Sequence, residues 1–277
     1  MRIWVNDRLV DEADAVVSVL DHGLTVGDGV FETVKVLGST PFALTRHLRR
    51  LAGSALGLGL PAPSDRAVRS AIEAVLDANA YGALGRLRIT YTAGVAPLGS
   101  ERGTNGPTLV IAVVPMAEPS ATTSVVTVPW PRNEHSALAG LKTTSYAENV
   151  IALARAHAVG ATEALASNTA GELCEGTGSN IFVVLDGQVV TPPLASGCLA
   201  GVTRDLLLEW SDAAELTVPM SALTEASEIF LTSTTRDVQG VSAVDGRALL
   251  ADPVAPGPVT AKLRAMFVAR ASEQTDP

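Results

Sequence analysis

The surroundings of Lys142 suit a lysine that acts as an amine. This residue lies in the stretch 138–145 (LAGLKTTS), among leucine, alanine, glycine and small hydroxyl residues and ahead of a helical pattern. Because removing a protonated ammonium from water is costly, a lysine in such company turns to water, finds a partner, or reacts as an amine. A desolvated lysine with a lowered pKa is the usual nucleophile that forms a Schiff base. Most lysines before a helix are solvated, so this stretch becomes informative only together with the rest of the chain.

Other segments carry groups that bind anions or a protonated ring. Glu175 lies in the glycine-rich turn CEGTGSN, just before an apolar strand. Gly201, Val202 and Thr203 open a helix whose free N–H groups and dipole suit a phosphate. Ser233, Thr234 and Thr235 place three hydroxyls at the end of a predicted strand. Arg50, on a predicted helix, can bind a phosphate with two hydrogen bonds. Pyridoxal phosphate requires such a set, because an amine forms the Schiff base and a carboxylate keeps the pyridine nitrogen protonated.

Composition argues against several other classes of function. The net charge of −9 comes with no basic block, which argues against binding to nucleic acid or to anionic membranes. The two cysteines, Cys174 and Cys198, suit a reducing compartment, and neither they nor the four scattered histidines have the spacing of metal ligands. The opening MRIWVNDRLV is typical of strand, turn and strand rather than of a signal peptide, and no apolar run reaches membrane length. We therefore predict a cytoplasmic protein that binds no metal.

The first part of the chain alternates between strand and helix patterns. Along the stretch 30–37, Phe31, Thr33 and Lys35 share one face of a predicted strand. Turn residues and apolar periodicity predict a hairpin, two helices and two further strands at 3–10, 45–58, 64–80, 86–92 and 108–114. The small, polar MAEPSATTS then favours a linker at residues 117–123, which divides the chain into domains 1–116 and 124–277.

The second part mixes strands and helices without a regular βαβ repeat, so we predict an α+β fold. A strand at 125–130 precedes Lys142, and the next helix is predicted to bury Tyr146, Val150 and Leu153. Thr203 is predicted to cap a helix that ends at Trp210. A hairpin, a strand and a helix are predicted at 181–191, at 228–232 and from Pro258 onward, and residues 272–277 are predicted to form a loose tail.

Six motifs run through nearly the whole chain: GDGVFETVKV, RHLRRL, LAGLK, EGTGSNIF, LAGVTRD and TSTTRDV. In order and approximate spacing they resemble those of the fold type IV pyridoxal-phosphate enzymes. These are the branched-chain aminotransferases, the D-amino-acid aminotransferases and the 4-amino-4-deoxychorismate lyases. The resemblance implies a smaller N-terminal α/β domain, a larger, barrel-like C-terminal domain that binds pyridoxal 5′-phosphate, and a homodimer.

The resemblance also assigns roles to single residues. It makes Lys142 the Schiff-base lysine, Glu175 the partner of the pyridine nitrogen, and Arg50, three residues after His47, the arginine that binds the phosphate. The remaining phosphate contacts are the backbone N–H groups of Val202 and Thr203 and the hydroxyls of Ser233 and Thr234. By contrast, Arg46, Arg49, Cys174 and His47 are expected to be structural or solvated.

Within the family the motifs divide between two activities. TSTTRDV and FETVKV resemble D-amino-acid aminotransferases, whereas PRNEHSALAGLK resembles the lyases. We predict a transaminase that moves an amino group from a D-amino acid, or from an (R)-amine, to a 2-oxo acid such as 2-oxoglutarate or pyruvate. The alternative is 4-amino-4-deoxychorismate lyase, which releases pyruvate to form 4-aminobenzoate.

One expected element of the D-amino-acid site is missing. D-aminotransferases hold the substrate α-carboxylate with an arginine and a histidine two residues apart. The corresponding loop here, TAGVAPLGSERG, has no histidine, and its first arginine is Arg102. Arg88 on the preceding strand is the first candidate for a replacement, and Lys35 beside Phe31 is a weaker one. Phe31 and Thr235 complete the candidate substrate contacts.

Overall fold

The structure is a computed structural model that describes residues 1–277, and the chain folds into two units. Unit 1 consists of Met1–Glu118, Leu141–Tyr146 and Thr275–Pro277, and unit 2 consists of Pro119–Gly140 and Ala147–Gln274. The mixture of helices and strands confirms the predicted α+β class. No helix is long and apolar enough to cross a membrane.

The division into units differs from the predicted one in its second part. The chain passes from unit 1 to unit 2 after Glu118, inside the predicted linker 117–123, but Thr122 and Thr123 already belong to a strand. The predicted domain 124–277 is not continuous, since Leu141–Tyr146 belongs to unit 1. The reason is local pairing, because Thr143 forms a β-bridge with Val30 of unit 1.

Unit 1 is built on a six-stranded antiparallel sheet in the order β2-β1-β6-β5-β3-β4. The register of β3 and β5 pairs Phe31 with Thr90 and Thr33 with Arg88. Opposed residues of an antiparallel pair share a face, so Arg88 lies on the face that carries Phe31. The strands are β1 (Arg2–Val5), β2 (Arg8–Asp11), β3 (Gly29–Leu37), β4 (Thr40–Pro41), β5 (Leu84–Thr92) and β6 (Thr108–Pro115).

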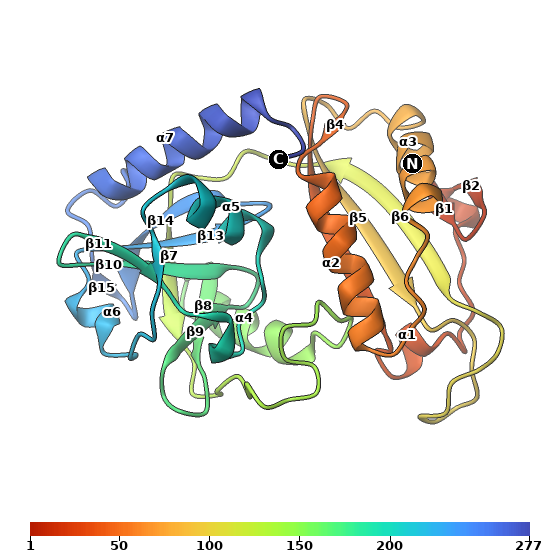
Figure 1. Ribbon diagram of the computed structural model, residues 1–277, viewed down its shortest axis with the longest axis horizontal. Helices are drawn as coiled ribbons and strands as arrows, with labels where there is room; N and C mark the ends of the chain where they lie inside the picture. The colour runs from red at the N-terminus through yellow and green to blue at the C-terminus, as the bar shows by residue number, and fades with distance from the viewer. The chain divides into compact units, whose positions relative to one another are not determined.

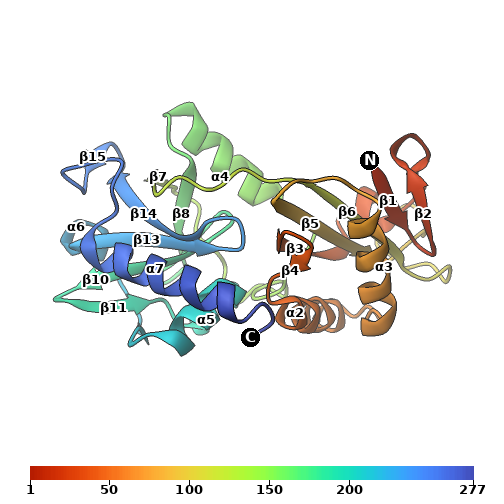
Figure 2. The same ribbon diagram turned by 90° about the horizontal axis from the view of Figure 1, so that it is seen from above.

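Helices α2 and α3 cover the other face of this sheet (Figure 1 and Figure 2). Their apolar stripes, with Leu51 and Ile72 as central members, pack against Val34 and Leu87 in one core, as the periodicity predicts. Ser64 caps α3 by accepting a hydrogen bond from the Ala67 amide at 3.4 Å. The helical segments of the unit are a 3₁₀ turn at Glu12–Asp14, α1 (His22–Thr25), α2 (Leu44–Gly57) and α3 (Asp65–Asp77).

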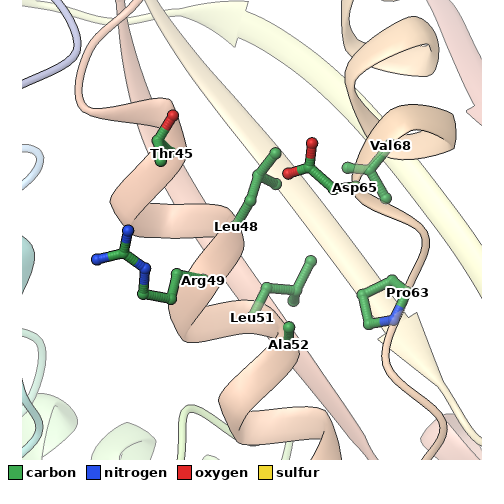
Figure 3. Close-up of a pocket in the computed structure, with 8 residues that line it drawn as sticks. All are labelled: Thr45, Leu48, Arg49, Leu51, Ala52, Pro63, Asp65 and Val68. Atoms are coloured by element: carbon green, nitrogen blue, oxygen red, sulfur yellow. The ribbon is translucent and has the colours of Figure 1, made fainter.

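A pocket of about 240 Å³ lies between α2 and α3 in unit 1 (Figure 3). Its walls are mainly apolar, and Arg49 and Asp65 are its charged members. Apart from these two the lining consists of Thr45, Leu48, Leu51, Ala52, Pro63 and Val68. None of the residues predicted to bind cofactor or substrate lines this pocket, so it is separate from the candidate active site.

Unit 2 contains a nine-stranded mixed sheet in the order β12-β11-β10-β13-β14-β7-β8-β9, with β15 paired to β14. The last strand of this order, β9, leads directly into β10 near the middle, because Gly176 N donates to Ser179 O at 2.8 Å in a tight turn. The sheet therefore curls as a half-barrel. The strands are β7 (Thr122–Thr127), β8 (Glu163–Ser167), β9 (Leu173–Gly176), β10 (Asn180–Leu185), β11 (Gln188–Thr191), β12 (Ala214–Glu215), β13 (Glu228–Ser233), β14 (Asp237–Val244) and β15 (Arg247–Ala248).

The helices of unit 2 pack outside this sheet, and α7 lies along β13 and β14 (Figure 2). Pro258 begins α7, and the hairpin of β10 and β11 turns at Asp186 and Gly187, both with positive φ, as predicted. The helical segments are α4 (Ala147–Ala158), a 3₁₀ turn at Leu194–Ser196, α5 (Val202–Trp210), α6 (Ala222–Glu225) and α7 (Pro258–Glu273).

The buried face predicted for α4 is wrong. Val150 is 64% exposed, whereas the buried positions of the helix are Asn149, Ala152 and Ala156. Ala152 and Ala156 pack against an alanine-rich part of the sheet that includes Ala164. Small side chains allow the helix to approach the sheet closely, and the larger apolar residues are left on the outer face.

Two further predictions about helix ends are corrected. Gly201, not Thr203, is the N-cap of α5, and Thr203 lies inside the helix. The last residues are not a loose tail, because Ala43 N donates to Thr275 O at 2.7 Å and Thr45 N donates to the Asp276 carboxylate at 2.8 Å. Helix α2 begins after Ala43, which has no capping side chain, so Asp276 supplies the missing acceptor.

Candidate active site

The main chain around Lys142 is held on both sides by unit 1. Lys142 N donates to Ser54 Oγ on α2 at 3.1 Å, and Lys142 O accepts from Phe31 N at 3.0 Å. The next residue, Thr143, is buried and forms the bridge with Val30. A short segment without regular structure is thereby fixed between a helix and a strand, which is how a lysine can be placed with precision on a loop.

Two aromatic rings lie beside the amine of Lys142, which is half-buried. Lys142 Nζ lies 4.4 Å from the centroid of the Phe31 ring and 5.8 Å from that of Tyr146. The two rings meet edge to face with their centroids 5.0 Å apart. Tyr146 was not among the candidate residues, although its position four residues after the lysine is a signal that could have identified it.

Arg88 lies against the same ring as Lys142. Its guanidinium carbon is 3.4 Å from the centroid of Phe31, its Nε donates to Thr90 Oγ1 at 3.3 Å, and it forms no ion pair. Burial of the guanidinium lowers the pKa of Arg88 to about 10, so it stays protonated at neutral pH. The weaker candidate, Lys35, is buried and lies over Phe42 instead, with Nζ 5.4 Å from the ring centroid.

Arg50 forms a bidentate ion pair with Glu32 of β3. Arg50 Nε and Nη2 donate to the two carboxylate oxygens of Glu32 at 2.7 and 2.8 Å, and His47 Nδ1 lies 2.7 Å from Glu32 Oε2. Burial alone would raise the pKa of Glu32, but Arg50 and His47 outweigh it and hold this pKa well below its usual range. The Nε–Nη2 edge of Arg50 is thus engaged in this ion pair. His47 is structural, as expected.

In unit 2, Glu175 on β9 is held by a backbone amide and by an arginine. Leu199 N donates to Glu175 Oε2 at 3.0 Å, and Arg132 Nε lies 3.5 Å from Glu175 Oε1. Arg132 also lies 3.6 Å from Glu148 of α4. An anionic carboxylate in such a place can hold a proton on a ring nitrogen by charge. Sequence analysis did not identify Arg132 as a partner of Glu175, since the two residues are distant in the chain.

A buried carboxylate joins the two turns that carry the other candidate residues. Glu163 is 2% exposed and accepts hydrogen bonds from Thr177 N at 2.9 Å and Ser179 Oγ at 3.1 Å, both in the turn after Glu175. Arg236, in the turn between β13 and β14, lies 3.5 Å from the same carboxylate. Glu163 therefore ties the EGTGS turn to the STTRD turn.

The predicted phosphate ligands of unit 2 lie at the N-terminus of α5 and in the STTRD turn. No side chain caps α5 at Gly201, so the first N–H groups of the helix are left for an external acceptor. A Cβ at Gly201 would lie 1.9 Å from Asn180 Oδ1, so only glycine fits there. Ser233 Oγ and Thr235 Oγ1 are 3.5 Å apart and flank Thr234, which makes this turn rich in hydroxyls.

The predicted residues form two groups, one in each unit. Unit 1 brings together Lys142, Phe31, Arg88 and Tyr146 around one ring and holds Arg50 on α2. Unit 2 provides Glu175, Val202, Thr203, Ser233 and Thr234. An amine among aromatic rings, an amide-held carboxylate and an uncapped helix N-terminus are the donor set that pyridoxal phosphate requires. Each unit thus offers part of the chemistry that a pyridoxal-phosphate enzyme uses.

Comparison with known proteins places the chain in a family. The family model "Amino-transferase class IV" matches residues 29–244. A putative branched-chain-amino-acid aminotransferase of Methanocaldococcus jannaschii is 33% identical over 96% of this chain and 95% of its own length. The D-alanine aminotransferase of Bacillus licheniformis is 28% identical over 94% of this chain and 93% of its own length. The chain belongs to the class IV aminotransferase family.

Solved structures agree with this assignment. A hypothetical aminotransferase from Mycobacterium tuberculosis, in its PLP-bound form, matches with a TM-score of 0.83 and 26% identity over 98% of this chain and 100% of its own. The resemblance to fold type IV enzymes is confirmed, and so is the predicted cofactor, since class IV aminotransferases use pyridoxal phosphate. As an aminotransferase, the protein acts on an amino donor and an oxo-acid acceptor.

Proposed function

We propose that the protein transfers amino groups from D-amino acids, and more slowly from (R)-amines, to a 2-oxo acid such as 2-oxoglutarate or pyruvate. The observation that carries the proposal is the pairing of Lys142 and Arg88 on the ring of Phe31, at 4.4 and 3.4 Å from its centroid. The carboxylate of an amino acid lies two bonds from its amine, so a cation without an ion pair beside the reactive lysine can receive it. Arg88 would thus replace the missing arginine–histidine pair.

The roles of the chain's own residues follow from their chemistry. Pyridoxal phosphate, when bound, supplies a carbonyl for the lysine amine and a ring that accepts electrons. Lys142 would hold the cofactor covalently through its amine and, as a neutral base, would move a proton at the substrate Cα. Glu175 holds a proton on the pyridine nitrogen, and Arg50, Val202, Thr203, Ser233 and Thr234 bind the phosphate. Phe31 and Thr235 line the substrate position.

D-amino acids are favoured by the paired threonines of the STTRD turn and by the similarity to the D-alanine aminotransferase of Bacillus licheniformis. A second candidate is transamination of L-branched-chain amino acids. It is supported by the similarity to the putative branched-chain-amino-acid aminotransferase of Methanocaldococcus jannaschii. The lyase remains the alternative on account of PRNEHSALAGLK.

A panel of donors on one preparation tests the proposal. D-alanine should react with 2-oxoglutarate, L-leucine should not, and an (R)-arylethylamine should react slowly. Arg88→Met should raise KM for D-alanine by roughly 10- to 100-fold, because a charge-assisted hydrogen bond is worth about 1.5–3 kcal/mol. The KM for the amine, which has no carboxylate, should change little. L-leucine as the best donor would establish the branched-chain activity, and turnover of aminodeoxychorismate alone would establish the lyase.

Replacing Glu175 by glutamine should slow the reaction more than it weakens cofactor binding. Glutamine is isosteric with glutamate but carries no charge, so it cannot keep the ring nitrogen protonated, while the phosphate ligands stay in place. Removing a preorganised charge costs on the order of 3 kcal/mol in the barrier, or about 10²-fold in kcat. The measurement is kcat with saturating cofactor, with cofactor affinity determined separately. An unchanged kcat with weakened cofactor binding would contradict the assigned role.

We also propose that the enzyme is a homodimer, as the resemblance implies. In the isolated chain an apolar stretch before β3 is strongly exposed: Val16 by 71%, Val19 by 76% and Leu24 by 66%. Exposed apolar stretches of this kind are typical of protein interfaces. Sedimentation equilibrium that gives the mass of a single chain would contradict the dimer. The cytoplasmic location stays a prediction from the sequence.

A further inference from the structure

Arg102 is held by its own unit instead of being available to a substrate. Its Nε and Nη2 donate to the two carboxylate oxygens of Asp28, each at 2.7 Å. Nη2 also donates to Leu58 O at 2.7 Å, and Nη1 donates to Gly59 O at 3.0 Å, at the C-terminal end of α2. Arg102, the first arginine of the loop TAGVAPLGSERG, therefore connects its own loop to Asp28 and to the end of α2.

Asp28 is fixed from a second side by a buried histidine. His22 is 1% exposed; its Nδ1 lies 3.1 Å from Asp28 Oδ2 and its Nε2 lies 3.0 Å from Gly99 O, in the loop that carries Arg102. The hydrogen bond from Arg102 is the largest cause that lowers the pKa of Asp28 below its ordinary value. Asp28 is thus an ionised, multiply bonded anchor at neutral pH.

The two residues that flank Asp28 bind the segment that carries Lys142. Gly27 O accepts from Thr144 Oγ1 at 2.9 Å and from Ser145 Oγ at 3.1 Å, and Gly29 O accepts from Thr144 N at 2.8 Å. Gly27 has a φ of +71°, and a Cβ there would lie 2.7 Å from Ser145 Oγ, so the contact is as close as glycine allows. One route from Arg102 to the lysine segment therefore runs through the turn Gly27–Gly29. A second runs through the end of α2, whose Ser54 Oγ accepts from Lys142 N.

From this continuous network we propose that Arg102 is a positioning residue for Lys142. Arg102 fixes Asp28, the turn around Asp28 fixes residues 143–145, and these fix the main chain of Lys142. Without the ion pair the turn is free to shift, and the lysine amine moves relative to the atoms on which it acts. The inference rests on the proposed role of Lys142 as the reactive amine. It assigns a function to an arginine whose guanidinium binds Asp28 and the end of α2.

The test compares two variants. Arg102→Met keeps the aliphatic part of the side chain, and Arg102→Lys keeps the positive charge but cannot form the bidentate ion pair. Amide hydrogen exchange is measured on the full-length chain, with and without cofactor. In Arg102→Met, the amides of Lys142 and Thr144 should exchange about 10-fold faster, since their partners are no longer fixed. With cofactor bound, kcat should fall by about 10-fold or more with little change in KM, because small displacements of reacting groups are costly. Arg102→Lys should recover part of both effects.

Arg69→Met is the matched control, because Arg69 forms an ion pair with Asp65 on α3, at 2.9 Å, that has no bond to the 141–146 segment. It should leave exchange at Lys142 and kcat unchanged. Faster exchange confined to the loop 94–106, with kcat retained, would overturn the proposal and make Arg102 merely structural. Borohydride reduction of the wild type tests the underlying function separately. A label on another lysine would refute the role of Lys142, whereas the exchange result would still report the mechanical coupling.

Discussion

Lys142→Ala should abolish measurable transamination, with a fall in rate on the order of 10⁴-fold. If Lys142 has its proposed role, the variant loses both the amine that would bind the cofactor covalently and the base that would move the substrate proton. Its fold should be retained, because Lys142 is fixed through its main-chain N–H and C=O, at 3.1 and 3.0 Å from their partners, which alanine also possesses. The loss of activity can therefore be assigned to chemistry rather than to unfolding.

Covalent labelling checks this prediction directly. The chain contains only three lysines, Lys35, Lys142 and Lys262, so borohydride reduction followed by peptide mapping has few alternatives to distinguish. The wild type should be labelled at Lys142 alone, and Lys142→Ala should not be labelled. Lys262→Ala, at an exposed position of α7, is the matched control and should keep full activity. Label at Lys35 or Lys262 in the wild type would contradict the assignment.

Patterns that depend on neighbouring residues predicted most of the fold. The alternation of side chains along residues 30–37 predicted β3, and the apolar stripe along 45–58 predicted α2. The turn residues Asp186 and Gly187 predicted the hairpin of β10 and β11. Such signals are reliable because a strand or a turn depends on side chains within a few positions. The sequence predicts Lys142 as the reactive lysine from its surroundings together with the family motifs, and in the structure its Nζ lies near the rings of Phe31 and Tyr146.

Features that depend on tertiary contacts could not be read from the sequence. The buried face of α4 was wrong because Ala152 and Ala156 pack against an alanine-rich strand, a choice that depends on the partner. The docking of Asp276 on α2 depends on a helix start more than 200 residues earlier in the chain, at a sequence separation of 231 for the Thr45 bond. Arg132, likewise, becomes meaningful only beside Glu175, at 3.5 Å.

The ion pair between Arg50 and Glu32 shows how the structure changes the interpretation of a motif residue. Arg50 was identified as a phosphate ligand, and the structure also makes it the partner of a fully buried carboxylate. Arg50→Ala would therefore leave Glu32 buried without its ion pair and would destabilise unit 1. A loss of cofactor in that variant would not distinguish a missing phosphate contact from a destabilised unit 1, so the ion pair is better tested by substituting Glu32.

Glu32→Gln should lower the free energy of unfolding by about 3 kcal/mol at pH 7.5. The side chain is 0% exposed, and breaking a buried ion pair from one side typically costs about 3–5 kcal/mol, because the remaining charge is left unpaired. Glutamine keeps one hydrogen-bond acceptor for Arg50, so the expected loss in the free energy of unfolding lies at the lower end of this range. The measurement is urea unfolding of the full-length protein. Glu73→Gln, at an exposed position of α3, is the matched control and should change stability by less than about 0.5 kcal/mol.

The pH dependence of this difference identifies its origin. The pKa of Glu32 is held well below its ordinary value of 4.5, so the unfolded chain binds the proton first as the pH falls. The stability that Glu32 contributes is complete above pH 4.5 and is lost as the pH falls towards the folded pKa. The gap between wild type and Glu32→Gln should therefore shrink by about 1.4 kcal/mol per pH unit well below pH 4.5. If the difference in stability between wild type and Glu32→Gln stays constant down to pH 3.5, altered packing and not the lost charge explains the lower stability of the variant.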